Sequence, residues 1–376
     1  ASVTPEKVYI QKADLVTGIG QAQIQNFSLT DYSTDTPKYQ GRAQLQNFNT
    51  SVITKSNAVG LISGDFTLKG QSFDVNKMII ETNSNIHRIE IMGKPYQNAT
   101  LIGTLNHRKY NGLVNINDPN LQGSVNGLID FSTPRLSADV KADFKRLNLG
   151  YLTGSKQSQI ITGSVDGKIA MTNLNDLMVD ANLSNVNIYA NNEKIEIPNG
   201  HIKSHVAGGE RFIDINAPGA AIGKINGKFN LADLAGMVQT GLNKILVGPE
   251  PHKKYIGQSF DMNFDVSQGL ISYFLPELKI PYGAHVDGAF DGNNNNLILN
   301  LDVEKAIYIM QNKDDIENTQ KALSVLNADV DISEVKPKQD SATIDQLMLR
   351  INTANKEQQI LAIIGRAELG NNILKK

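Results

Sequence analysis

Few residues in this chain have the types and the spacing that catalysis or metal binding requires. His201 and His205 are four residues apart, which suits a zinc site when both lie on one helix face. Here they fall in a segment that alternates like a strand, and neither a Glu-x-x-His motif nor a cysteine accompanies them. We therefore predict two solvent-facing strand histidines, with a metal site as the less favoured alternative.

Two other patterns are fragments of ligand-binding motifs. Gly18-Ile19-Gly20 has two glycines of a dinucleotide-binding turn but lacks the third. Asp314-Asp315-x-Glu317 supplies carboxylates without the alternating ligand order and the turn glycine of a calcium loop. We interpret both patterns as exposed turns. The sequence predicts no enzyme: no catalytic residue, no metal and no cofactor.

The composition limits the class of protein. The 376 residues carry a net charge of -2, which gives no reason to expect nucleic acid as a partner. Hydrophobic residues make up 40% and aromatic residues 6%, without tryptophan, which is little material for a thick two-layer core. The lack of cysteine excludes disulfides and thiolate metal sites and is compatible with a cell-envelope compartment. No apolar run is long enough for a membrane-spanning helix.

A short phrase recurs along the chain: apolar, any, Gly, any, apolar, usually followed two residues later by a third apolar residue. Its period of two is typical of strands with one apolar face, and its copies recur at near multiples of about twenty residues, the length of one hairpin. The pattern predicts a long antiparallel sheet. The copies are Tyr39-x-Gly41-x-Ala43-x-Leu45, Ile62-x-Gly64-x-Phe66-x-Leu68, Leu101-x-Gly103-x-Leu105, Val125-x-Gly127-x-Ile129-x-Phe131, Val165-x-Gly167-x-Ile169-x-Met171, Ile225-x-Gly227-x-Phe229-x-Leu231, Val286-x-Gly288-x-Phe290 and Ile363-x-Gly365-x-Ala367-x-Leu369.

The alternation is nearly continuous, so we expect residues 1–376 to form one repeating β-segment. The chain begins at Ala1 without methionine or a signal peptide, and we expect it to be a piece of a longer protein. From Leu231 the apolar residues follow a helical spacing, which predicts a helical insertion over 231–247. Asn230 is its expected N-cap, and Gly248-Pro249 is its expected stop. The helix could cover the apolar face as a lid or pack on a sheet edge.

The apolar face has two alternative interpretations, a closed core or an open trough. Glycine inside a strand marks bending or close approach, so a row of glycines across neighbouring strands would curl the sheet. We therefore predict an all-β fold, a long twisted antiparallel sheet curled into an open hydrophobic groove. An unfilled groove would expose more apolar surface than a soluble monomer tolerates, and acyl chains are the natural filling. The residues expected to line it are Phe66, Leu68, Ile129, Phe131, Val140, Phe144, Ile169, Val179, Phe229, Phe290 and Leu299.

Three stretches resemble the TamB/AsmA-like group of bacterial envelope proteins, specifically the TamB-like proteins of the Bacteroidetes. The first runs from Val125-Asn126-Gly127 through Thr133-Pro134-Arg135-Leu136 to Leu149, and the second is Ile225-Asn226-Gly227-Lys228-Phe229-Asn230-Leu231. The third, Phe260-x-x-x-Phe264-x-Val266 to Phe274-Leu275-Pro276-Glu277-Leu278-Lys279-Ile280-Pro281, is similar to a recurring unit of strand, Pro-Glu-Leu turn and strand. The resemblance is best over residues 100–305.

This resemblance implies a β-taco, a U-shaped antiparallel sheet with a hydrophobic interior. It also implies a periplasmic protein tethered to the inner membrane by an N-terminal anchor outside this chain. A C-terminal part would contact an outer-membrane BamA/TamA-like barrel, and the cargo would be phospholipid moving between the two membranes. The chain departs from the group by having neither the anchor nor a convincing barrel-binding segment, which fits a middle stretch of such a bridge.

Three functions stay open at this stage. The first is a lipid conduit along the hydrophobic groove. The second is a scaffold or chaperone for outer-membrane protein assembly, acting with the BamA/TamA-like barrel through strand addition. The third is an extracellular β-solenoid with a structural or adhesive role, which predicts an interior filled by side chains.

Overall fold

Over the residues that it describes, the computed structural model is nearly all β, with 69% strand and 9% helix. It describes residues 2–54, 59–74, 76–91, 93–153, 159–190, 193–244, 254–274, 277–314, 316–317, 336, 340–354, 360–369 and 372–373. The strands form antiparallel sheet that does not close, so the predicted all-β open architecture is confirmed. The chain divides into two units, Ala1–Thr172 and Asn173–Lys376, which are described separately.

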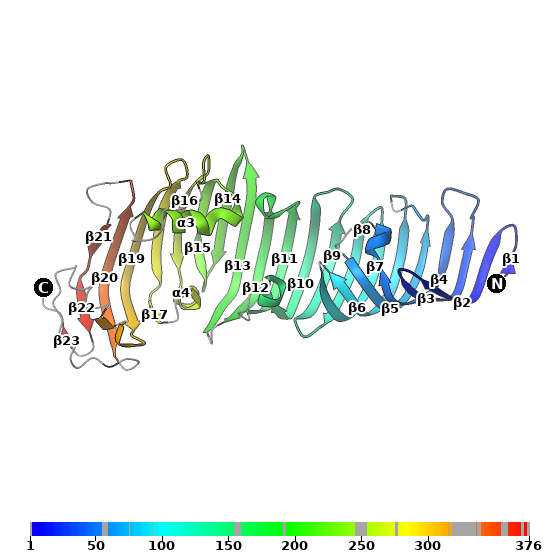
Figure 1. Cartoon of the computed structure of the whole chain (residues 1–376), viewed down its shortest axis with the longest axis horizontal. Coiled ribbons are helices and arrows are strands. Elements are labelled where there is room, and N and C mark those ends of the chain that lie inside the picture. Colours follow the sequence, from blue (N-terminus) through cyan, green and yellow to red (C-terminus); the bar gives the residue numbers. More distant parts are fainter. Residues whose placement is uncertain are drawn as a thin grey trace. The chain divides into compact units, whose positions relative to one another are not determined.

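In the first unit each strand pairs with the next one in the sequence, which makes a simple meander (Figure 1). Among the described residues β1 pairs only with β2, so this sheet has a free edge. The strands are β1 (Ser2–Val3), β2 (Lys7–Thr17), β3 (Gly20–Thr30), β4 (Lys38–Asn49), β5 (Val59–Gln71), β6 (Ile79–Ile91), β7 (Lys94–Asn106), β8 (Lys109–Asn117), β9 (Leu121–Asp130), β10 (Leu136–Asn148) and β11 (Ile160–Met171).

The strand register brings the apolar residues of the repeat into continuous rows. Because directly paired residues point to the same face, a row can be followed from strand to strand. One row crosses β3 to β11 through Ile24, Ala43, Phe66, Ser84, Leu101, Val114, Val125, Ala142 and Val165. The adjacent row on the other face is polar and consists of Gln44, Asp65, Asn85, Thr100, Asn115, Ser124, Asp143 and Ser164.

The strand glycines also fall into register. Gly103, Gly112, Gly127 and Gly167 lie in one row across β7, β8, β9 and β11, with Val140 of β10 between the last two. A Cβ atom at Gly127 would lie 2.2 Å from the Asp139 carbonyl oxygen, and the φ of Gly127 is +144°. Both facts require glycine, because a side chain would strike the neighbouring backbone and this φ disfavours L-residues. The row therefore marks a line where neighbouring backbones approach closely.

An aromatic ring fills part of the space that these glycines leave. The Tyr110 hydroxyl lies 3.1 Å from the Ile102 carbonyl oxygen and 3.3 Å from that of Leu113, so it can donate to either. Cβ atoms at Gly103 and Gly112 would fall 2.8 and 2.7 Å from this hydroxyl. Burial raises the pKa of Tyr110. The tyrosine thus packs over glycine backbone that would otherwise be bare, a known way to stabilise glycine in a sheet.

In the second unit the order of paired strands is β12-β13-β14-β15-β16-β18-β19-β20. The short β17 pairs with the far part of β19, β20 pairs with both β21 and β22, and β23 pairs with β22. The strands are β12 (Met178–Ala190), β13 (Glu193–Ala207), β14 (Glu210–Ala217), β15 (Ala221–Lys228), β16 (Ser259–Val266), β17 (Leu278–Lys279), β18 (Ala284–Asp291), β19 (Asn296–Ile309), β20 (Ser341–Asn352), β21 (Ile360–Ile363), β22 (Arg366–Leu369) and β23 (Asn372–Ile373).

The predicted helical insertion is present. A 3₁₀ turn, η2 (Leu231–Asp233), leads directly into α3 (Leu234–Asn243). The proposed cap works differently from the expectation: the Asn230 side chain caps no backbone N–H and instead donates from Nδ2 to Asp233 Oδ2 at 3.2 Å. Residues 245–247 and the expected stop at Gly248-Pro249 lie outside the described residues.

The strand expected at Phe260–Val266 is present as β16, but it does not lead directly into the Pro-Glu-Leu segment. Residues Gln268–Phe274 form a helix, α4, and the strand that follows, β17, has only two residues. Ser267 explains the helix start, because its Oγ accepts a hydrogen bond from the Leu270 N–H at 3.4 Å, as an N-cap does. The last copy of the repeat also departs from a single strand: it is broken at Gly365, and β21 and β22 pair separately with β20.

Three other short helical segments were not predicted. In the first unit α1 (Ser51–Thr54) follows β4, and α2 (Leu149–Thr153) follows β10. In the second unit η1 (Leu174–Asp176) precedes β12. All three have five residues or fewer and sit at strand ends, where the alternating pattern of the sequence stops.

Gly127→Ala should destabilise the first unit by about 1–3 kcal/mol from backbone strain alone, with the clash against Asp139 adding to it. The midpoint of urea unfolding measures this change. Gly18→Ala is the matched control, because a Cβ atom there meets nothing within 4 Å. Equal midpoints for the two variants would contradict the assigned role of the glycine row.

Candidate functional site

The candidate site in the first unit is the apolar face of its sheet. Six of the predicted lining residues lie on this face in the observed register, on strands β5, β9, β10 and β11, and all are half-buried: Phe66, Leu68, Ile129, Val140, Phe144 and Ile169. Phe131 follows directly after β9, and its side chain is 38% exposed. These seven residues therefore come from one unit, and the six that lie within strands share one face.

In the described part of the first unit, the short helices lie at the strand ends and leave most of this face without a second layer. Its main contacts between elements join neighbouring strands, while α1 packs against β5 and α2 against β11. Tyr151 of α2 also reaches the start of β7, where its ring stands edge-on to Tyr96 with centroids 5.9 Å apart and its hydroxyl donates to the Pro95 carbonyl oxygen at 3.0 Å. The tightest cluster consists of Ile62, Ile86 and Ala99, which pack against the half-buried Phe66 and Leu101. The core here is one side chain deep, and much of the apolar row remains accessible.

A polar pair interrupts the row on β6. Thr82 and Ser84 stand on the apolar face at positions where the neighbouring strands carry Leu68 and Phe66. Their hydroxyl oxygens are 2.6 Å apart, so one hydroxyl donates to the other, and Ser84 is 1% exposed. The pair fills space without leaving an unsatisfied hydroxyl, and the face is therefore not uniformly aliphatic.

In the second unit a comparable row is present, but helices cover part of it. Val179 and Leu299 share a row that runs from β12 to β20 and are half-buried. Phe229 and Phe290, also expected to line a groove, are only 7% and 3% exposed. They belong to a closed cluster with Ile225, Met237, Tyr255, Phe260 and Leu297, in which Met237 comes from α3.

The second helix of this unit covers another part of the face. Ile271 of α4 packs against a cluster formed by Ile280, Ala284, Val303 and Ala306. α4 also contacts β13, where Ile195 is 2% exposed. The second unit therefore buries its apolar face largely with its own helices, α3 and α4.

A buried arginine on the same face was missed from the sequence. Arg211 pairs with Gly227 in the β14–β15 ladder and is 2% exposed. Its Nη1 donates to the Leu177 carbonyl oxygen at 2.8 Å and to Ser204 Oγ at 3.0 Å, and its Nη2 donates to the Asn175 carbonyl oxygen. Burial lowers the pKa of this guanidinium. The available signal was that Arg211 occupies an apolar position of the alternating run Arg211-x-Ile213-x-Ile215.

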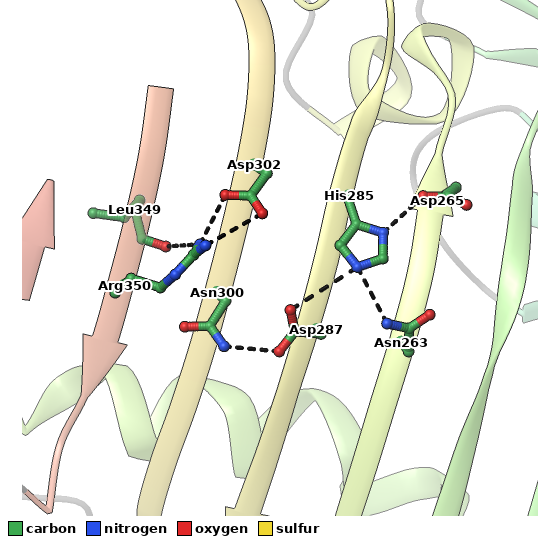
Figure 2. A network of polar contacts seen from close by, with 8 residues as sticks. All are labelled: Asn263, Asp265, His285, Asp287, Asn300, Asp302, Leu349 and Arg350. Carbon is green, nitrogen blue, oxygen red and sulfur yellow. Dashed lines mark hydrogen bonds and ion pairs between the residues drawn. The ribbon is translucent and has the colours of Figure 1, made fainter. Parts of the chain in front are cut away.

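The opposite face of the second unit carries polar pairs that bridge neighbouring strands (Figure 2). His285 of β18 lies between Asp265 of β16, 2.7 Å from Nδ1, and Asp287 of its own strand, 3.9 Å from Nε2. Arg350 of β20 pairs with both carboxylate oxygens of Asp302 of β19, at 2.8 and 3.3 Å. Half-exposed pairs of this kind contribute little each, but they identify this face as the solvent side.

The two histidines considered for metal binding have separate surroundings. His201 Nε2 lies 2.9 Å from Asp180 Oδ1, whereas the His205 ring stacks on Phe212 with centroids 5.1 Å apart. His201 is partly exposed as predicted, but Nδ1 of His205 is buried and makes no hydrogen bond. Among the described residues no group of three or more His, Asp or Glu could hold a metal ion. Asp315 of the acidic pattern lies outside those residues.

Comparison with known proteins gives no match to a family model, to a curated protein or to a solved structure. Within the part of the chain that the structure describes, no helix combines the length and the apolar character needed to cross a membrane. The family resemblance therefore stays a prediction, and the functional argument depends on the two faces of the sheet.

On the polar face of the first unit, Asp130 gives a pH-dependent test. A hydrogen bond from Ser132 Oγ at 2.5 Å, with Lys109 Nζ at 2.9 Å and the Ser132 N–H at 2.9 Å, lowers the pKa of Asp130 to about 2. The carboxylate therefore contributes stability above its unfolded pKa of about 4, and this contribution is lost as the pH falls through the folded value. Asp130→Asn should lower the urea midpoint at neutral pH, and the gap to the wild type should close near pH 2.

Ser132→Ala removes the main cause of the shift and should reduce the same pH dependence. A gap between Asp130→Asn and the wild type that is equal at both pH values would show that the carboxylate charge is not involved.

Proposed function

We propose that the apolar face of the first unit binds acyl chains and that the protein is a conduit for phospholipid. The observation that carries this proposal is the in-register apolar row from β3 to β11, a face that the described helices α1 and α2 reach at the strand ends. With neighbouring strands about 4.8 Å apart, such a row runs for roughly 40 Å.

The chemistry of the face favours acyl chains over polar ligands. Burial of each methylene is worth about 0.8 kcal/mol, and a continuous row offers the same gain at each successive strand. A ligand held only by this term has no preferred stopping point, which suits movement along the face. The strands of the interior already pair on both sides, so a peptide could add only at an edge.

The cellular setting is part of the proposal and rests on the resemblance to TamB/AsmA-like proteins. In that setting the chain lies in the periplasm, tethered to the inner membrane through an N-terminal anchor and reaching a BamA/TamA-like barrel in the outer membrane. Phospholipid acyl chains would cross the aqueous space along the groove. A scaffold role in outer-membrane protein assembly would use the sheet edge instead of the face.

Two adjacent residues on opposite faces provide the test. Ile129 points to the apolar face and is half-buried, whereas Leu128 lies on the polar face and is 40% exposed. Ile129→Asp should reduce copurified phospholipid, measured by native mass spectrometry, by about tenfold or more, because the lost aliphatic contact and the desolvated carboxylate together exceed 1.4 kcal/mol.

Leu128→Asp is the control and should retain the lipid. Equal lipid content in the two variants at equal accumulation would overturn the proposal. Photo-crosslinks to lipid from position 129 would support it, and crosslinks to protein clustering at the strand edges would favour the scaffold.

A further inference from the structure

Two copies of the repeat differ in how far their apolar side chains are exposed: the copy in the first unit is partly exposed, and the copy in the second unit is covered. In Val125-x-Gly127-x-Ile129-x-Phe131 the last two apolar side chains are half-buried and 38% exposed. In Ile225-x-Gly227-x-Phe229-x-Leu231 the phenylalanine is only 7% exposed. Because the two phrases have the same alternation, the difference comes from what lies over the second one.

The chain itself supplies that cover. Directly after Leu231 the backbone turns through η2 into α3, which runs across the strands of the second unit (Figure 1). Met237 of α3 is fully buried between Phe260, Phe290 and Leu297, while Leu234, Val238 and Leu242 pack at the margin of the same cluster. The helix thus places four aliphatic side chains on the apolar face.

Two glycines let the helix sit close to the sheet. A Cβ atom at Gly241 would lie 2.4 Å from Leu297 Cβ, and one at Gly236 would lie 2.2 Å from the Tyr255 hydroxyl. Glycine in a helix interior costs about 1 kcal/mol relative to alanine, so these two positions favour close seating over helix stability. Helix α3 therefore fits closely against this surface, although its two interior glycines make it less stable than an ordinary helix.

Polar contacts hold the two ends of the cover. At the C-terminal end, Lys244 Nζ donates to the Asn294 carbonyl oxygen at 2.6 Å and to Asn296 Oδ1 at 2.7 Å. At the N-terminal end, Asp233 accepts a hydrogen bond from Gln258 Nε2 at 2.9 Å. Between these ends the cluster is aliphatic and aromatic, so an acyl chain could take the place of the α3 side chains with equivalent contacts.

We propose that the surface beneath α3 is a latent acyl-binding segment and that α3 is its internal occupant. The ligand is a single saturated or monounsaturated hydrocarbon chain, bound along Phe229, Phe260 and Phe290 when the helix is displaced. This inference rests on the proposed function, because it assumes that the apolar face binds acyl chains where it is uncovered.

The test unseats α3 and measures binding of the fluorescent fatty acid dansylundecanoic acid to the full chain. The background is Ile129→Asp, in which binding to the first unit is reduced. Gly241→Leu adds a side chain where Leu297 leaves no room, and Met237→Gln weakens the same contact without adding bulk at the helix backbone. While the covered form predominates, a tenfold rise in the uncovered fraction lowers the apparent dissociation constant about tenfold.

Gln239→Leu is the matched control, because Gln239 lies on the exposed side of α3 and the change adds an apolar side chain without disturbing the seat. Hydrogen exchange of the α3 amides reports whether the helix has left the sheet, and circular dichroism reports whether the strands persist. We expect faster exchange in α3 and tighter probe binding in both test variants, with neither change in the control.

Faster exchange without tighter binding would overturn the inference, as would an α3 that stays protected in both variants, since the helix would then be a fixed part of the core. If circular dichroism shows that Gly241→Leu has lost its strands, the result for Met237→Gln alone tests the inference. Failure of the proposed function has a different signature: the chain with Ile129 intact would bind no more probe than its Ile129→Asp variant.

Discussion

The structure depends on one constraint: every hairpin presents an apolar face that the hairpin itself cannot bury. Alternation with a period of two places these faces on the same side, and the antiparallel register joins them into rows. Once the rows exist, the remaining question for each part of the sheet is what covers them. They can be covered by neighbouring side chains, by a helix or by a ligand.

The two units answer that question differently. In the second unit α3 and α4 pack on the apolar face, and side chains such as Met237 and Leu297 lose all contact with water. In the first unit α1 and α2 stay at strand ends, and the apolar rows keep partial exposure. The first unit is therefore the part of the molecule to which we assign the proposed binding of acyl chains.

The main features of the fold followed from local patterns. Alternation around Gly127 and Val140 predicted strands, faces and the alignment of glycines, because each of these is set by neighbouring residues in the sequence. The helix after Leu231 was also visible, since its apolar residues recur at the helical period. These predictions needed no knowledge of what the elements touch.

The features that were missed depend on contacts distant in sequence. Nothing near Met237 indicates that it will pack with Phe260 and Phe290, so the sequence left open whether the helix would cover the apolar face or pack on a sheet edge. Arg211 reaches carbonyl groups more than thirty residues away, at Leu177 and Asn175. The α4 segment is short, and the residue that caps its start, Ser267, is a weak signal in the sequence. Sequence reasoning identified candidate lining positions, but the extent to which each is covered is a tertiary property.

The meander of the first unit also has a consequence for how the protein forms. Since every strand there pairs with its neighbours in the sequence, each new hairpin can dock on the one made just before it, and no segment has to wait for a distant partner. Such a sheet can grow from one end while the rest of the chain is still being delivered. It can also gain or lose a hairpin over evolutionary time without redesign of the remainder, so the length of the array can change in steps of one hairpin.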